Sequence, residues 1–154
     1  MAENKPPRLN VRKIYLKDAS FESPGSPGIF LQAAMQPHID LSIDVSHRQI
    51  DDDGKFYEVT LQVTTTATKD EQTLFLAEIY QAGIFEINAD DDDHQELLLR
   101  VGCPNMLLPF AREEISSLVT KGGFPQLLIA PINFESVYRQ ERAAMAEEAS
   151  PTIQ

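Results

Sequence analysis

The segment His38-Ile-Asp-Leu-Ser-Ile-Asp-Val45 alternates apolar and polar side chains without interruption. Side chains of a β-strand point to opposite faces in turn, so this alternation predicts a strand with one buried and one solvated face. Downstream, Asp51-Asp-Asp-Gly54 ends in Asp-Gly, a pair that supplies the positive φ of a tight turn. A second alternating segment, Tyr57-Glu-Val-Thr-Leu-Gln-Val-Thr64, follows it. Together they predict an antiparallel β-hairpin.

Two further strands are expected on either side of this hairpin. The first runs from Leu9 to about Ala19, where the consecutive apolar residues of Ile14–Leu16 indicate either a β-bulge or burial on both faces. The other runs from Thr73 to Ile87, after a turn at Lys69–Glu71. Its second face is too apolar for open water, which predicts that another layer or a subunit covers part of it.

Helical periodicity begins after the fourth strand. Carboxylates at Asp90–Asp93 favour a helix N-terminus, and apolar residues then recur at three- and four-residue spacing as far as Val119. Pro104 and Pro109 each remove an intrahelical hydrogen bond, so we expect a kinked helix, with Gly122 as its C′ residue.

A last, shorter helix is predicted from an N-cap at Asn133 to about Glu147. Strands followed by helices in this order indicate an α+β fold. The predicted architecture is therefore a four-stranded antiparallel sheet, a long kinked helix and a C-terminal helix.

Composition and charge limit the class of protein. The length fits a single domain over residues 1–154, with residues 9–144 ordered and residues 1–8 and 145–154 as mobile tails. The net charge of −11 argues against nucleic acid and anionic membranes and favours a basic polypeptide partner, although simple solubility explains it equally well. The sequence shows no secretory signal, no run near the ~18 apolar residues of a membrane span, and a single cysteine, so we expect a cytoplasmic protein.

The usual catalytic motifs are missing from the sequence, including a phosphate-binding glycine loop, a nucleophile elbow and HExxH. His38, His47 and His94 lack ligand spacing, and the aspartate runs lack the spacing of a calcium loop. Cys103 lies in an apolar setting that favours an inert, packed thiol. We therefore expect no enzymatic activity, no metal and no cofactor.

Two irregular segments, 21–37 and 121–131, are unusually apolar for connections between elements. Apolar loops with Met and Phe suit recognition of varied hydrophobic ligands, because they can repack. The alternatives are that both segments pack on their own sheet, or that they are buried at subunit contacts of a structural oligomerisation domain. Their apolar residues are Phe21, Ile29, Phe30, Leu31, Met35, Phe124, Leu127, Leu128 and Ile129.

Four motifs also resemble the SecB family of bacterial protein-export chaperones, and the resemblance extends from about Val11 to Tyr138. The motifs are Arg12–Pro24; Tyr57–Val59 with the threonine-rich strand after it; Gln81–Phe85; and Cys103–Glu113, followed by Gly123–Leu127 and Ala130–Phe134. Met35 stands where many members carry Trp, and residues 149–154 carry no charged side chain.

The resemblance implies an ATP-independent holdase that binds unfolded precursor proteins in the cytoplasm, keeps them translocation-competent and delivers them to the SecA ATPase. It implies a homotetramer built as a dimer of dimers. In the family, client segments lie in grooves lined by the two apolar segments, and SecA docks on an acidic face of the sheet. The corresponding docking positions are Asp18, Glu22, Leu76 and Glu78. The alternative on the same fold is a holdase with general or antitoxin-linked clients and weak SecA coupling.

Overall fold

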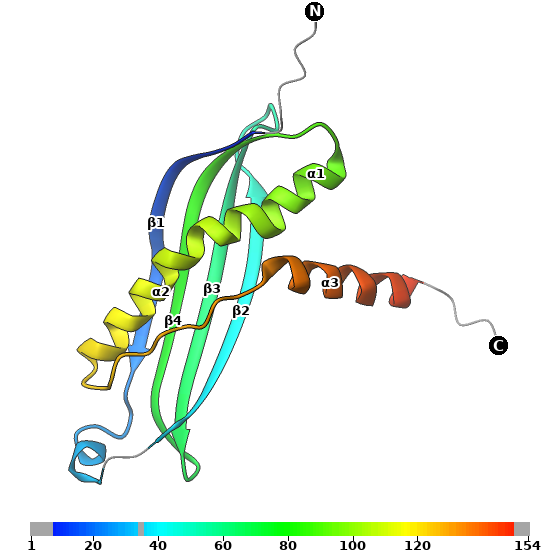
Figure 1. Cartoon of the computed structure of the whole chain (residues 1–154). Helices are drawn as coiled ribbons and strands as arrows, with labels where there is room; N and C mark the ends of the chain where they lie inside the picture. Colours follow the sequence, from blue (N-terminus) through cyan, green and yellow to red (C-terminus); the bar gives the residue numbers. More distant parts are fainter. Residues whose placement is uncertain (1–7, 34–35, 150–154) are drawn as a thin grey trace, which may run out of the picture.

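The predicted hairpin forms the two adjacent strands at one edge of a four-stranded sheet in the computed structural model, which describes residues 8–33 and 36–149 (Figure 1). The strand order is β1-β4-β3-β2, and every neighbouring pair is antiparallel. The predicted sheet is thus confirmed. Its strands are β1 (Arg8–Glu22), β2 (His38–Gln49), β3 (Phe56–Lys69) and β4 (Gln72–Asn88).

The turn between β2 and β3 forms as the Asp-Gly pair predicts. Gly54 has a φ of 70°, and the Asp51 carboxylate accepts hydrogen bonds from the backbone N–H groups of Lys55 and Phe56, at 3.1 and 2.9 Å. The aspartate run therefore serves the turn, as expected for Asp at this position.

The long helix consists of three consecutive segments that run diagonally across one face of the sheet (Figure 1). These are α1 (Asp92–Leu97), a wider π-helical turn (Leu98–Gly102) and α2 (Cys103–Lys121). α3 (Phe134–Ala149) projects away from the sheet, and a short 3-10 helix (Gly28–Leu31) lies in the connection between β1 and β2. The α+β architecture with a long interrupted helix is confirmed.

The core lies between α2 and the sheet. The buried row on α2 has a strict four-residue spacing, which places it on one side of the helix: Cys103, Leu107, Ala111, Ile115 and Val119. It packs mainly over β4 and also over β3, whose core-facing residues include Ile79, Leu61 and Val63, all fully buried. Burying one such side chain contributes roughly 1.5–3 kcal/mol, so this helix–sheet contact dominates the stability of the protomer.

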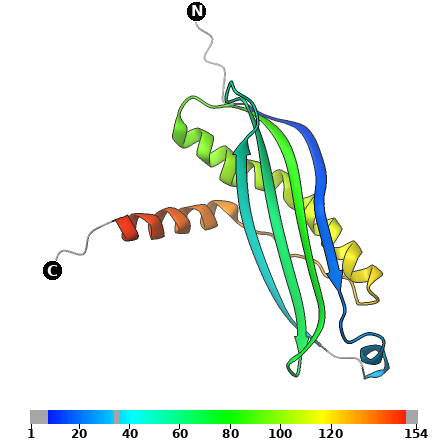
Figure 2. The same cartoon turned by 180° about the vertical axis from the view of Figure 1, so that it is seen from behind.

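The other face of the sheet is open. Figure 2, seen from behind, shows no helix of the described chain over this face. The second face of β4, for which a covering layer was predicted, therefore has no helix over it within the described residues. Leu76 on it is 36% exposed, whereas Leu74, near the start of the strand, is buried in the core.

β1 contains two bulges, which confirms one of the two interpretations of its irregular pattern. The register with β4 shifts between Val11 and Lys13 and again between Leu16 and Asp18. The extra residues are Arg12 and Lys17, and both are cations.

The structure also differs from the sequence-based boundaries. β1 extends to Glu22, so Phe21 belongs to a strand and not to the irregular segment that was predicted to begin there. α3 continues to Ala149, so residues 145–149, expected in a mobile tail, are helical. Residues 1–7 and 150–154 lie outside the described residues, and the single-domain assignment stays a prediction.

Candidate functional site

The end of α2 places an aromatic side chain over the sheet. The Phe124 N–H bonds to the Val119 carbonyl at 3.2 Å, and the Gly123 N–H bonds to the Thr120 carbonyl at 3.0 Å. This pair of bonds is the Schellman motif, whose C′ residue adopts a left-handed conformation. That residue is Gly123, with a φ of 92°, and not Gly122, whose φ is −74°. The prediction of Gly122 as the C′ residue was therefore off by one position.

Phe124 joins three other phenylalanines from separate parts of the chain. Its ring centroid lies 5.0 Å from that of Phe75 on β4, 5.3 Å from Phe30 and 6.3 Å from Phe21. Phe21 also stacks on Phe75 at 5.8 Å. Such spacings are typical of attractive aromatic pairs. We call these four residues the aromatic cluster.

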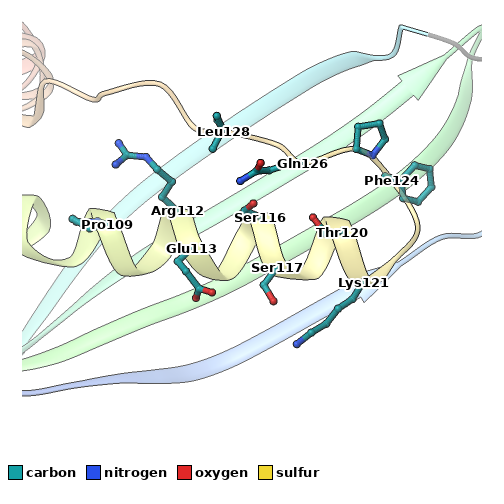
Figure 3. Close-up of a pocket in the computed structure, with 11 residues that line it drawn as sticks. Pro109, Arg112, Glu113, Ser116, Ser117, Thr120, Lys121, Phe124, Gln126 and Leu128 are labelled. Atoms are coloured by element: carbon teal, nitrogen blue, oxygen red, sulfur yellow. The ribbon is translucent and has the colours of Figure 1, made fainter.

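Two hollows lie on either side of Phe124. The larger, of about 840 Å³, lies between α2 and the segment that follows it, and we call it the helix groove (Figure 3). Its lining runs from Pro109 to Lys121 along α2 and from Phe124 to Leu128 along the other wall. The smaller, of about 460 Å³, is the sheet groove, which is lined by Pro37, Ile39, Leu74, Phe75, Leu127 and the cluster's Phe124, among others.

The segment between α2 and α3 is fixed against the body by Ile129 and Arg112. Ile129 is only 5% exposed and packs in the core. The Arg112 Nε atom donates to the Ile129 carbonyl at 3.0 Å. Leu128, one residue earlier, is 68% exposed and faces the helix groove. This alternation makes the segment a wall with an apolar outer surface.

Three of the nine predicted client-binding residues line these hollows, namely Phe124, Leu127 and Leu128. Phe21 and Phe30 adjoin them through their contacts with the Phe124 ring. Leu31 is 90% exposed and Phe30 is 48% exposed, whereas Phe21 and Ile29 are half-buried. Leu127 lines the sheet groove and Leu128 the helix groove. Ile129 does not belong to this surface, because it is part of the core. Met35 lies outside the described residues.

The four predicted docking residues lie together on the open face of the sheet. Glu22 on β1 is paired with Leu76 on β4, and two residues further along each strand Ser20 is paired with Glu78. Asp18 follows opposite Tyr80. The side-chain period of a strand puts all of these on one face.

Glu78 is held as a carboxylate by its neighbours on this face. Thr64 donates to it at 2.9 Å and Gln62 at 3.4 Å. The hydrogen bond from Thr64 is the main cause that lowers the pKa of Glu78 below its ordinary value.

A cluster of polar residues on the same face was not predicted from the sequence. The buried Glu58 carboxylate on β3 accepts from Lys17 Nζ at 2.8 Å, from Arg48 Nε at 3.0 Å and from the Tyr15 hydroxyl. Burial alone would raise the pKa of Glu58, but the hydrogen bonds from Lys17, Tyr15 and Arg48 lower it to about 2. The irregular apolar pattern of β1 was the only feature of the sequence that could have indicated this cluster. It marks the bulge at Lys17, and the bulge brings the Lys17 side chain to Glu58 on β3.

Cys103 behaves as its apolar surroundings predict. It is fully buried in the helix–sheet core, and burial raises the pKa of its thiol to about 12. The thiolate is therefore not formed at neutral pH. Within residues 8–33 and 36–149, no group of three or more His, Cys, Asp and Glu side chains could hold a metal ion. In the same ranges no helix is long and apolar enough to cross a membrane.

Comparison with known proteins supports a specific class. A family model described as preprotein translocase subunit SecB matches residues 2–145. The protein-export protein SecB of Chromobacterium violaceum is 49% identical over 141 residues, covering 92% of each chain. That of Hydrogenovibrio crunogenus is 43% identical over 145 residues, covering 94% of this chain and 95% of the relative. Among solved structures, the Mycobacterium tuberculosis SecB-like chaperone in complex with a ChAD peptide from an antitoxin has a TM-score of 0.68 at 16% identity, over 81% of this chain and 91% of that one.

The fold and the matches together define a chaperone and not an enzyme. The structural likeness supports the fold alone, while the sequence matches cover nearly the whole chain. The chain belongs to the SecB family of protein-export chaperones.

Proposed function

We propose that this chain is an ATP-independent holdase of the cytoplasm, which binds unfolded segments of precursor proteins in the helix groove and the sheet groove. The observation that carries the proposal is the exposure of Leu128 and Phe30 at two hollows that meet at Phe124, where Leu128 lines one hollow and Phe30 packs on the Phe124 ring. An exposed apolar surface of this kind is typical of a protein-binding site. Each 100 Å² of apolar client surface buried there contributes about 2.5 kcal/mol before the ordering cost of the client is subtracted.

The proposal includes a homotetramer. Four copies would present several grooves to one client, so the first contact raises the effective concentration of the next. The net charge of −11 per chain keeps such an assembly soluble and attracts basic client segments.

Suppression of aggregation tests the holdase directly. A denatured precursor is diluted into buffer without nucleotide, with or without an equimolar amount of the tetramer, and light scattering is followed. We expect the tetramer to hold scattering near the baseline. Scattering that rises equally in both samples contradicts the proposal.

We further propose that the holdase delivers its clients to SecA, which docks on the open sheet face at Asp18, Glu22, Leu76 and Glu78. Three carboxylates and one exposed leucine lie there on two adjacent strands, which gives a flat surface with an apolar contact among negative charges. A basic partner surface would complement it. The client is then released by competition or remodelling by SecA, without nucleotide bound to this chain.

Charge reversal distinguishes docking at this face from a general attraction between the acidic chain and a basic partner. Glu78→Lys places a cation at the centre of the face, and we expect SecA affinity to fall about tenfold or more because like charges oppose a basic partner. Glu147→Lys makes the same charge change on the exposed surface of α3 and is the matched control. If Glu78→Lys binds SecA as tightly as the native chain does and still binds clients, SecA does not dock at this face.

A further inference from the structure

The direction of the acidic side chains on β1 depends on one bulge. Leu16 is paired with Gln81 on β4, and Asp18 is paired with Tyr80. Gln81 lies on the side of β4 that carries the core, whereas Tyr80 lies on the open face. Residues two apart in a regular strand face the same side, yet Leu16 and Asp18 face opposite sides. The extra residue Lys17 accounts for this, because one added residue reverses the faces of the residues that follow.

A carboxylate on β3 holds this bulge from the open face. One oxygen of Glu58 accepts from Lys17 Nζ at 2.8 Å, and the other accepts from the Tyr15 hydroxyl. Both side chains reach across β4, where the residue opposite Tyr15 is Ala82. Ala82 is fully buried although no helix of the described chain covers this face, which fits a Tyr15 side chain lying over it. The bulged residue and the residue two before it are therefore tied to one carboxylate.

Glu58 itself is not available to a docked partner. Its side chain is only 8% exposed, and Arg48 on β2 is its third hydrogen-bond partner, at 3.0 Å. A bulged residue is left out of the strand ladder, so its position depends on contacts of its side chain. Glu58 can therefore act on docking in two ways, through its charge or through the bulge that it holds.

The end of β1 has an anchor of its own. Glu22 follows Phe21, whose ring stacks on Phe75 at 5.8 Å and lies against Gly122. These contacts are on the helix side of the sheet and do not involve Glu58. The position of Glu22 is thus set by the aromatic cluster.

Asp18 depends on the bulge instead. It follows Lys17 directly, and its carboxylate accepts from the Ala19 N–H at 2.9 Å, a bond that does not reach another strand. We propose that Glu58 is a positioning residue for docking, which holds the Lys17 bulge and so fixes the Asp18 carboxylate on the open face near Glu78. The inference rests on the SecA docking proposed above and gives a role in it to a residue that SecA does not touch.

Truncation of the clamp should weaken docking while the grooves keep their clients. Affinity of the full native chain for SecA is measured by calorimetry near neutral pH. Asp18→Ala should lower it about tenfold, as expected for the loss of a charged hydrogen bond, and Glu58→Ala at least about fivefold. Tyr15→Phe, which removes one bond of the clamp without a charge change, should lower it about two- to threefold. Circular dichroism and precursor protection confirm that each variant is folded and binds clients.

Two controls separate the clamp from the charge of Glu58. Glu86→Ala removes the same charge from the ion pair with Arg12 at the first bulge, roughly 26 Å along β4 from Glu78, and should leave SecA affinity within about twofold. The double variant Glu58→Ala, Lys17→Met restores the local charge balance without restoring the clamp. Its affinity should stay as low as that of Glu58→Ala.

A double-mutant cycle identifies the residue through which Glu58 acts. In an Asp18→Ala background, Glu58→Ala should change SecA affinity by less than about twofold, because the contact that it misplaces is already absent. In a Glu22→Ala background it should keep its full effect. If Glu58→Ala does not fold, Tyr15→Phe takes its place in the same cycle.

Three results overturn the inference: native affinity in the clamp variants, a loss that is equal with and without Asp18, or a loss that Lys17→Met restores. SecA docking itself stands in all three cases as long as Asp18→Ala weakens it. If Asp18→Ala and Glu78→Lys both bind SecA as tightly as the native chain, the docking proposal fails and the inference fails with it.

Discussion

Gly122 lies directly against the ring of Phe21, at the point where the end of α2 meets β1. A β-carbon on Gly122 would come within 2.1 Å of the Phe21 Cζ atom. The backbone of Gly122 is helical, with a φ of −74°, so the requirement for glycine here is steric and not conformational. This contact sets the position of the aromatic cluster relative to the helix.

Gly122→Ala should therefore displace Phe21 and disturb the aromatic cluster. Overpacking of this kind costs about 1–3 kcal/mol of unfolding free energy, and we expect client affinity to fall with it. Chemical denaturation and precursor binding are the two measurements. Gly28→Ala is the control, since a β-carbon at Gly28 meets nothing within 4 Å. Equal stability of both variants would show that Phe21 can move without cost.

Leu128→Ser should separate client binding from stability. Leu128 is 68% exposed, so its loss should change the unfolding free energy by no more than about 0.5 kcal/mol. Precursor affinity should nevertheless fall, because the apolar wall of the helix groove loses its most exposed side chain. Leu41→Ser, on the edge strand β2, removes a partly exposed leucine outside both grooves and should leave affinity unchanged. A similar loss in both variants would indicate unspecific hydrophobic binding.

Glu58 makes the stability depend on pH in the acid range. The pKa of Glu58 in the folded chain is about 2, below the ordinary value of 4.5. The contribution of the Glu58 carboxylate to the unfolding free energy is therefore complete above about pH 4.5 and is lost as the pH falls toward 2. A shift of this size corresponds to at most about 3 kcal/mol. Unfolding free energies of the native chain and of Glu58→Gln, measured between pH 6 and pH 3, provide the comparison. The variant should lose less stability over this range, and identical pH profiles would contradict the assignment.

The N-cap of α3 has a measurable contribution. The Asn133 Oδ1 atom accepts from the Ser136 N–H at 3.0 Å, and this confirms the predicted cap. Asn133→Ala should reduce the stability of α3 by about 1 kcal/mol, while Asn133→Asp should retain it. Helix content measured by circular dichroism on heating distinguishes the two variants. If Asn133→Ala and Asn133→Asp melt at the same temperature, the Asn133 side chain does not stabilise α3 as a cap.

The local parts of this fold could be predicted because local chemistry specifies them. Alternation from His38 to Val45 and the pair Asp53-Gly54 specify a hairpin by themselves, and Asn133 marks the start of a helix. The four-residue apolar row on α2 predicts which side of the helix is buried, although not which strands it meets.

Contacts between distant residues could not be predicted in the same way. Lys17 and Glu58 meet only because a bulge changes the register of β1, and a one-residue shift in a strand reverses which face each side chain occupies. The burial of Ile129 depends on the path of an irregular segment, which has no periodicity to reveal it. The steric requirement for glycine at position 122 depends on the ring of Phe21, far away in sequence.

Site-specific photo-cross-linking tests the central claim that client segments occupy the two grooves beside Phe124. A benzophenone amino acid is placed at Leu31, at Leu128 or, as a control on the open sheet face, at Asp44, and each chain is irradiated with an unfolded precursor. The account predicts strong cross-links from positions 31 and 128 and weak ones from position 44. Cross-links that are equal at all three positions, or strongest at position 44, would contradict it.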